Sequence, residues 1–102
     1  KIKNEKNASI CVVLASKGYP SNYKKGVLIK NIDKAQELNG IEIFHAGTSI
    51  LDNKIVSSGG RVLSITSKAE NIKKARQVAY KALKIIGWNE GFYRKDIGIK
   101  NI

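Results

Sequence analysis

The chain has 102 residues and a formal net charge of +11, from 19 lysines and arginines against 8 acidic residues. This length is typical of one domain with a modest hydrophobic core. No apolar run approaches the roughly 20 residues of a membrane helix, and no secretory signal pattern is found. We therefore expect a cytoplasmic protein without a membrane partner.

The sequence contains no methionine and begins at Lys1. Because a translation product normally begins with methionine, we expect a piece of a longer polypeptide. Such a piece would hold only part of an active site. We expect residues 1–102 to form a single domain, with residues 1–8 as a linker or tail.

A high positive charge in general favours nucleic-acid binding. Here only three of the 19 cations are arginine, and the lysines are scattered from Lys1 to Lys100. The chain is also rich in isoleucine and asparagine, so a compositional bias accounts for the charge. We expect no nucleic-acid partner and keep a basic nucleic-acid-binding module as an alternative.

The first predicted element is a strand at Ser9–Ser16. Its continuous apolar run is rich in β-branched residues, which is typical of a strand buried on both faces. Cys11 lies in this run and is expected to be a reduced core residue, since one cysteine forms no disulfide framework or zinc site. A turn follows in which Tyr19 beside Pro20 is expected to pack, with a stacking platform as the alternative. Two weaker elements come next, a short strand and one or two helical turns: Gly26–Lys30 and Asp33–Leu38.

From residue 41 the pattern predicts a β-meander. Four candidate strands are separated by short turns: Ile41–His45, Thr48–Leu51, Lys54–Ser57 and Arg61–Thr66. His45 has no cysteine or acidic partner nearby, so a hydrogen-bonded structural role is favoured over a base or a metal ligand.

Apolar residues then recur at helical spacing and predict an amphipathic helix at about 70–86. Ser67 followed by Glu70 has the spelling of a capping box, and Gly87 is a suitable stop. A short strand at Phe92–Arg94 is expected to end the domain.

The strongest candidate for a binding site is the turn with Gly59 and Gly60. Arg61 follows it directly, and arginine is rare in this chain. A two-residue loop would pair the flanking strands as a hairpin and place Lys54 and Arg61 on one face. These two cations would then clamp a phosphate or a carboxylate. A three-residue loop would separate them, and a solvated hairpin with ordinary surface charges is the alternative interpretation.

No sequence pattern for catalysis is present. The chain has no P-loop, dinucleotide fingerprint or nucleophile elbow. Its 8 acidic residues include no closely spaced pair suited to acid–base chemistry or to magnesium. We expect no catalytic residue and no metal ligand here, and the residues alone indicate a small α+β domain that binds an anion.

Five phrases, taken in order, resemble the C-terminal domain of phosphoribosylamine–glycine ligase: Val12–Pro20, Tyr23–Gly26, Ile43–Thr48, Ser58–Leu63 and Phe92–Gly98. The resemblance implies a mainly β (α+β) fold, a half-barrel β-sandwich with one amphipathic helix. This is the barrel-sandwich hybrid of the rudiment single-hybrid type. It also implies packing against the N-terminal and ATP-grasp domains of the same chain.

The resemblance further implies a ligase of de novo purine synthesis. Such a ligase joins glycine to 5-phosphoribosylamine through a glycyl-phosphate intermediate and yields glycinamide ribonucleotide. ATP and magnesium (or manganese) would bind in the full-length enzyme, outside this fragment. The isolated domain would complete the phosphoribosylamine site and be inactive alone.

In related purine ATP-grasp enzymes a lysine and an arginine seven residues apart hold the ribose phosphate. Lys54 and Arg61 have this spacing, so the resemblance implies that they bind the substrate phosphate, with Gly59 and Gly60 as the supporting turn. Ser64 stands where the family typically has glycine. A biotinyl- or lipoyl-type carrier domain, with Lys54 as the modified residue, is a further alternative.

Overall fold

The computed structural model describes residues 8–95. It contains one long helix, one short helix and six strands in the described range, in the order β1 Ala8–Ser16, α1 Ile32–Gln36, β2 Ile41–His45, β3 Thr48–Leu51, β4 Lys54–Ser57, β5 Arg61–Ala69, α2 Ile72–Ile86 and β6 Gly91–Phe92. The expected residues 1–8 tail lies outside this range except for Ala8, which begins β1.

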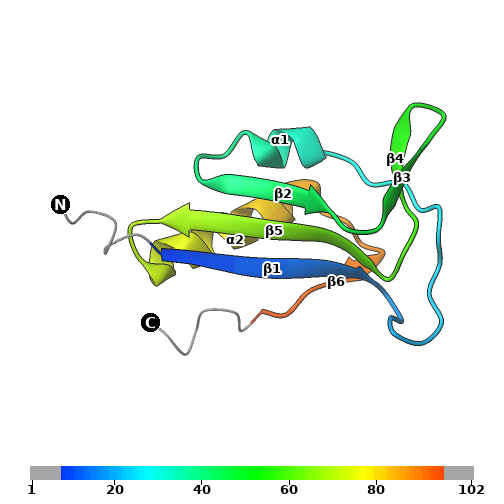
Figure 1. Ribbon diagram of the computed structural model, residues 1–102, viewed down its shortest axis with the longest axis horizontal. Helices are drawn as coiled ribbons and strands as arrows, with labels where there is room; N and C mark the ends of the chain where they lie inside the picture. Colours follow the sequence, from blue (N-terminus) through cyan, green and yellow to red (C-terminus); the bar gives the residue numbers. More distant parts are fainter. Residues whose placement is uncertain (1–7, 96–102) are drawn as a thin grey trace.

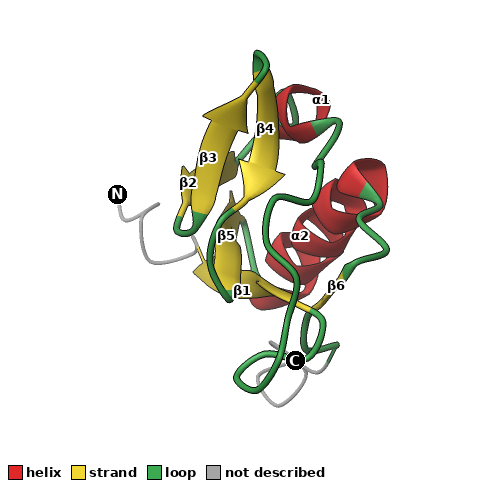
Figure 2. Cartoon of the chain, turned by 90° about the vertical axis from the view of Figure 1, so that its right-hand side faces the viewer, coloured by secondary structure: helices red, strands yellow, loops and turns green. Residues whose placement is uncertain are grey.

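The strands form two separate antiparallel sheets (Figure 1). The larger has the order β2-β5-β1-β6, and the smaller is the β3–β4 hairpin. In Figure 2 the hairpin rises at one end of the molecule, while α2 lies against the larger sheet. Mainly β structure, open sheets and one long helix agree with the expected α+β, half-barrel-like fold.

Over residues 9–14 of β1, only one face of the larger sheet is buried. Along β1 the side chains of Ile10, Val12 and Leu14 are buried, whereas Cys11 and Val13 are exposed. The prediction of a strand buried on both faces, with Cys11 in the core, is therefore wrong. The reason is that α2 covers one face only, so the strand follows the period of two. Cys11 lies on the open face, where its Sγ is 3.0 Å from the Ser64 Oγ.

Helix α2 supplies the second layer of the core. Its buried residues recur at helical spacing: Ala75, Ala79, Ala82, Leu83 and Ile86. Alanines at the contact let the helix approach the buried strand residues, which include Leu63 and Ile65 at 0% exposure. The predicted helix at about 70–86 is confirmed.

The predicted N-cap of α2, Ser67, is wrong. Asn71, not Ser67, is the N-cap, and its Oδ1 accepts a hydrogen bond from the Lys74 N–H at 2.8 Å. Ser67 instead belongs to β5 and points into the core, so it lies too early in the chain to cap the helix. Gly87 ends the helix as expected, with a left-handed φ of 54°.

Two weaker elements are shorter than expected. The segment around Leu28 runs along β4 with one isolated bridge to Val56 rather than as a regular strand. The last strand is Gly91–Phe92, shorter at its end than the predicted Phe92–Arg94. Residues 96–98 of the final resembling phrase lie outside the described residues.

Candidate functional site

The strand partner of β4 differs from the predicted one. β4 pairs with β3, and β5 pairs with β1 and β2, so the β4–β5 hairpin is wrong. The tight turn is at Asp52 and Asn53, whose φ values are 53° and 65°. Asparagine and aspartate tolerate this left-handed region best after glycine, which allows the short hairpin here.

The separation of the two sheets also parts Lys54 from Arg61. Lys54 lies opposite Leu51, next to the hairpin turn, whereas Ser57 lies at the base, opposite Thr48. Three residues of strand place Lys54 about 10 Å beyond Ser57. Arg61 lies opposite Ala15 in the larger sheet. The predicted diagonal pairing of the two cations on one face is therefore not formed.

The link between the sheets, Ser58–Arg61, is here called the Gly-Gly-Arg corner. Hydrogen bonds hold its backbone from two sides. The Ser58 N–H donates to the Gly47 carbonyl at 2.8 Å, and the Ser16 N–H donates to the Gly60 carbonyl at 2.7 Å. The hydroxyl of Ser16, which is only 2% exposed, donates to the Gly59 carbonyl at 3.1 Å. The corner is therefore a fixed part of the fold.

Close packing requires glycine at Gly60 in the corner and at Gly47, which lies against the corner. A β-carbon on Gly60 would overlap the ring of Tyr19. A β-carbon on Gly47 would overlap the carbonyl oxygen of Arg61. Neither residue has a positive φ, so glycine is needed at both positions for space rather than for backbone conformation.

Arg61 leaves this corner with its side chain exposed. Within residues 8–95 its guanidinium has no ion pair or hydrogen bond that would occupy it. Arg61 is the first residue of β5. An exposed guanidinium there presents several N–H donors in one plane, a geometry that matches the oxygens of a phosphate. This arrangement suits binding and orientation of an anion, and it offers no group for proton transfer.

His45 has the structural role that its sequence context favours. Its Nδ1 is 2.8 Å from the Thr48 hydroxyl, which bridges the ends of β2 and β3. His45 and Lys54 both line a surface cavity of about 710 Å³ beside α1. Within the described residues, no group of three histidine, cysteine or acidic side chains is placed to hold a metal ion.

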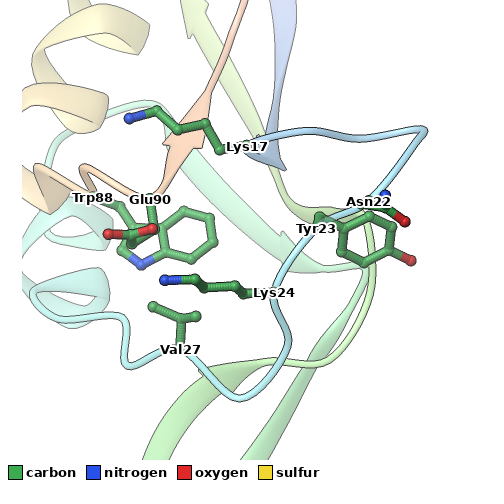
Figure 3. A pocket seen from close by; sticks show the side chains of 7 residues that line it. All are labelled: Lys17, Asn22, Tyr23, Lys24, Val27, Trp88 and Glu90. Atoms are coloured by element: carbon green, nitrogen blue, oxygen red, sulfur yellow. The ribbon is translucent and has the colours of Figure 1, made fainter.

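A second cavity, of about 390 Å³, has lysines at its rim (Figure 3). Lys17 and Lys24 line it together with Glu90 and Trp88. In Figure 3, Lys24 and Glu90 lie on the Trp88 side, with Tyr23 on the other. Glu90 adds a carboxylate to this cavity, and its negative charge would repel a phosphate. The cavity is therefore a poorer phosphate site than the Gly-Gly-Arg corner.

Sequence reasoning missed how the corner is supported. Tyr19 packs in its turn as expected, but its partner Gly60 was not foreseen, and neither were the contacts of Ser16 and Gly47. The local signals were the glycine pair Gly59-Gly60 and the Gly18-Tyr19 turn, but neither names the other as its partner. No pattern within a few residues predicts a contact between Tyr19 and Gly60, because they are 41 positions apart in the sequence.

No helix within residues 8–95 is both long enough and apolar enough to cross a membrane. The fold and the corner together define a small α+β domain that presents a fixed arginine and contains no catalytic constellation among its described residues.

Residues 9–100 match the family model described as "Phosphoribosylglycinamide synthetase, C domain". The chain belongs to this family. It is 51% identical over 90 residues to phosphoribosylamine–glycine ligase of Brucella melitensis, covering 88% of this chain and 21% of that protein. It is 47% identical over 98 residues to the trifunctional purine biosynthetic protein adenosine-3 of Gallus gallus, covering 96% of this chain and 10% of that protein.

A solved structure is also similar, that of phosphoribosylamine–glycine ligase from Thermotoga maritima. The TM-score is 0.73 at 34% identity, and the match covers 86% of this chain and 21% of that one. The chain thus spans about a fifth of the length of the single ligases that it matches. The family membership favours a ligase domain over the carrier-domain and nucleic-acid alternatives.

Proposed function

We propose that this chain is the substrate-side domain of a phosphoribosylamine–glycine ligase and that Arg61 binds the 5-phosphate of phosphoribosylamine. The full enzyme joins glycine to phosphoribosylamine with ATP hydrolysis and forms glycinamide ribonucleotide. This domain contributes binding and orientation, and it is inactive alone.

The observation that carries the proposal is the exposed guanidinium of Arg61, which has no ion pair or hydrogen bond within residues 8–95, at a corner fixed by backbone hydrogen bonds. The substrate carries a dianionic phosphate at one end and reacts at its amine, at the other. A fixed cation at the phosphate end restrains where the amine lies, and such restraint lowers the barrier by reducing the entropy lost in the reaction.

The remaining parts of the ligase have roles that this chain does not supply. ATP and magnesium or manganese would bind in an ATP-grasp domain of the same polypeptide. An N-terminal domain would complete the glycine and phosphoribosylamine sites. The proposed location of the enzyme is the cytoplasm.

Lys54 is proposed only as a secondary contributor. It lies near the tip of the β3–β4 hairpin, so it reaches the phosphate only if the bound substrate extends along the hairpin. Its exposed ammonium would add long-range attraction for the anion.

The test is the Arg61→Ala variant of the full-length ligase. Loss of a charge-assisted contact of about 1.5–3 kcal/mol should raise KM for phosphoribosylamine by about 10- to 100-fold. The KM for ATP should stay within about twofold. Arg61→Lys should recover part of the loss, because lysine restores the charge without the fork. An unchanged KM for phosphoribosylamine in Arg61→Ala would rule out the phosphate role.

Lys54→Ala serves as the matched control, since it removes one exposed cation from the neighbouring sheet. We expect an effect several times smaller than that of Arg61→Ala, and one that disappears at high salt because it acts through long-range attraction. An effect equal to that of Arg61→Ala at every salt concentration would instead mean that both cations contact the phosphate.

A further inference from the structure

We propose that Tyr19 is a positioning residue for Arg61: its ring covers Gly60 and thereby sets the direction in which Arg61 leaves the corner. This inference rests on the proposed phosphate role of Arg61. It assigns a function to the Lys17–Gly26 loop, which no catalytic pattern in the sequence explains.

The first support is the contact between Tyr19 and Gly60. A β-carbon built on Gly60 would overlap Cδ1 and Cε1 of the Tyr19 ring, so the ring occupies the space that a side chain at position 60 would need. Gly60 is outside the left-handed region. The ring therefore accounts for the glycine, and the two residues form one packing unit.

The second support is that Tyr19 is itself held in place. Its N–H donates to the Ser16 carbonyl at 3.0 Å, directly behind the end of β1. Tyr23 packs its ring against that of Tyr19, with 5.8 Å between the ring centroids and 63° between the planes. Gly18, at a φ of +95°, lets the chain turn so sharply that the Asn22 carbonyl fills the place of its side chain.

The third support is the position of Gly60 in the chain. Its carbonyl is fixed by the Ser16 N–H at 2.7 Å, and its other side faces the ring. Glycine has the widest choice of backbone conformations of any residue. With both sides occupied, Gly60 keeps one conformation, and Arg61 starts β5 in one direction. Loss of the ring would remove the contact on one side of Gly60, while the hydrogen bond from the Ser16 N–H and the strand pairing of β5 would remain.

The experiment measures phosphate recognition in the full-length ligase. Tyr19→Ala should raise KM for phosphoribosylamine by about tenfold or more, since a misplacement of about 1 Å can cost up to about 100-fold. The KM for ATP should not change. Tyr19→Phe should behave like the unaltered enzyme, because within the described residues the Tyr19 hydroxyl makes no hydrogen bond and only the ring is needed.

A double-mutant cycle separates positioning from a general structural role. If Tyr19 acts through Arg61, then Tyr19→Ala added to Arg61→Ala should cause no further rise in KM for phosphoribosylamine. Two independent effects would multiply, and that result would overturn the inference. Tyr23→Ala removes the ring that packs against Tyr19 and not against Gly60. It should raise KM for phosphoribosylamine by less than Tyr19→Ala does, and an equal or larger rise would contradict a direct role of the Tyr19 ring.

Folding is checked in parallel by thermal unfolding of each variant. If Tyr19→Ala does not fold, Tyr19→Leu replaces it, because leucine keeps apolar bulk without the flat ring. A normal KM for phosphoribosylamine in a folded Tyr19→Ala or Tyr19→Leu enzyme overturns the positioning role while Arg61→Ala still responds. If Arg61→Ala leaves KM for phosphoribosylamine unchanged, the proposed phosphate role of Arg61 is wrong, and the positioning role of Tyr19 is wrong with it.

Discussion

Gly47 and Gly59 bring two distant parts of the backbone into contact. A β-carbon on Gly47 would lie 3.1 Å from the Gly59 Cα, a separation closer than ordinary van der Waals contact. The same β-carbon would overlap the Arg61 carbonyl oxygen. The start of β5 is therefore packed against the β2–β3 turn without any side chain between them.

This contact predicts that Gly47→Ala destabilises the fold by about 1–3 kcal/mol, the usual cost of overpacking. The measurement is chemical denaturation of the chain. Gly59→Ala is the matched control, because its β-carbon would meet neighbours at no less than 3.6 Å. Equal losses for the two variants would show that the close approach at Gly47 is not the cause.

The buried serines Ser67 and Ser57 form a natural pair for a second prediction. Ser67 is 0% exposed, and its hydroxyl finds no hydrogen-bond partner among the described residues. Ser57 is 1% exposed, and its hydroxyl accepts a hydrogen bond from the Val27 N–H at 3.1 Å.

We expect Ser67→Ala to stabilise the chain by about 1 kcal/mol, because it removes an unsatisfied buried hydroxyl. Ser57→Ala should destabilise it by about 1–3 kcal/mol, since it leaves the Val27 N–H unpaired. Denaturation midpoints at equal m-values test both. A loss of stability in Ser67→Ala would mean that its hydroxyl has a partner.

The N-cap of α2 gives a third prediction. Asn71→Ala should cost about 1 kcal/mol, because the first-turn N–H of Lys74 loses its acceptor. Amide hydrogen exchange should become faster at Lys74 and its neighbours. Asn71→Asp keeps an acceptor and is the control, so faster exchange there as well would contradict a capping role.

The pair of Glu70 and Lys74 gives the pH prediction. Their side chains are 2.7 Å apart, and the hydrogen bond and charge of Lys74 lower the pKa of Glu70. A carboxylate with a lowered folded-state pKa adds stability that is present above its unfolded pKa. That stability is lost as the pH falls through the folded-state pKa.

We therefore expect Glu70→Gln to be slightly less stable than the unaltered chain at pH 7 and equal to it near pH 3. The gap should also shrink at high salt, because both side chains are exposed. Denaturation at the two pH values is the measurement. A gap that persists at pH 3 would exclude the ion pair as its cause.

The local elements were predictable because their signals lie within a few residues. The spacing of Ala75, Ala79 and Leu83 indicates the helix, and Gly87 ends it where a left-handed residue is needed. The strands of the meander were also found within a few residues of their ends. Cys11 was misplaced, because an apolar run does not reveal whether a second layer covers both faces of a strand.

The candidate site was only partly predictable for the same reason. Arg61 and its two preceding glycines stand out as a local phrase, and the structure leaves the arginine exposed at a fixed corner. The pairing with Lys54 failed because strand partners are selected by burial and by the backbone geometry of the whole domain. Asp52 and Asn53 supplied a better hairpin turn than the glycine pair, and β5 paired where β1 and β2 bury its core face.

By itself, then, the order of residues determined where most helices and strands lie, how α2 ends and that a rare arginine follows a glycine pair. The tertiary structure alone decided which strands pair, which face of β1 meets water and which ring rests on Gly60. The physical reason is range: propensity, periodicity and capping act within a turn or two of the chain. Packing joins segments such as Tyr19 and Gly60 that meet only when the core closes.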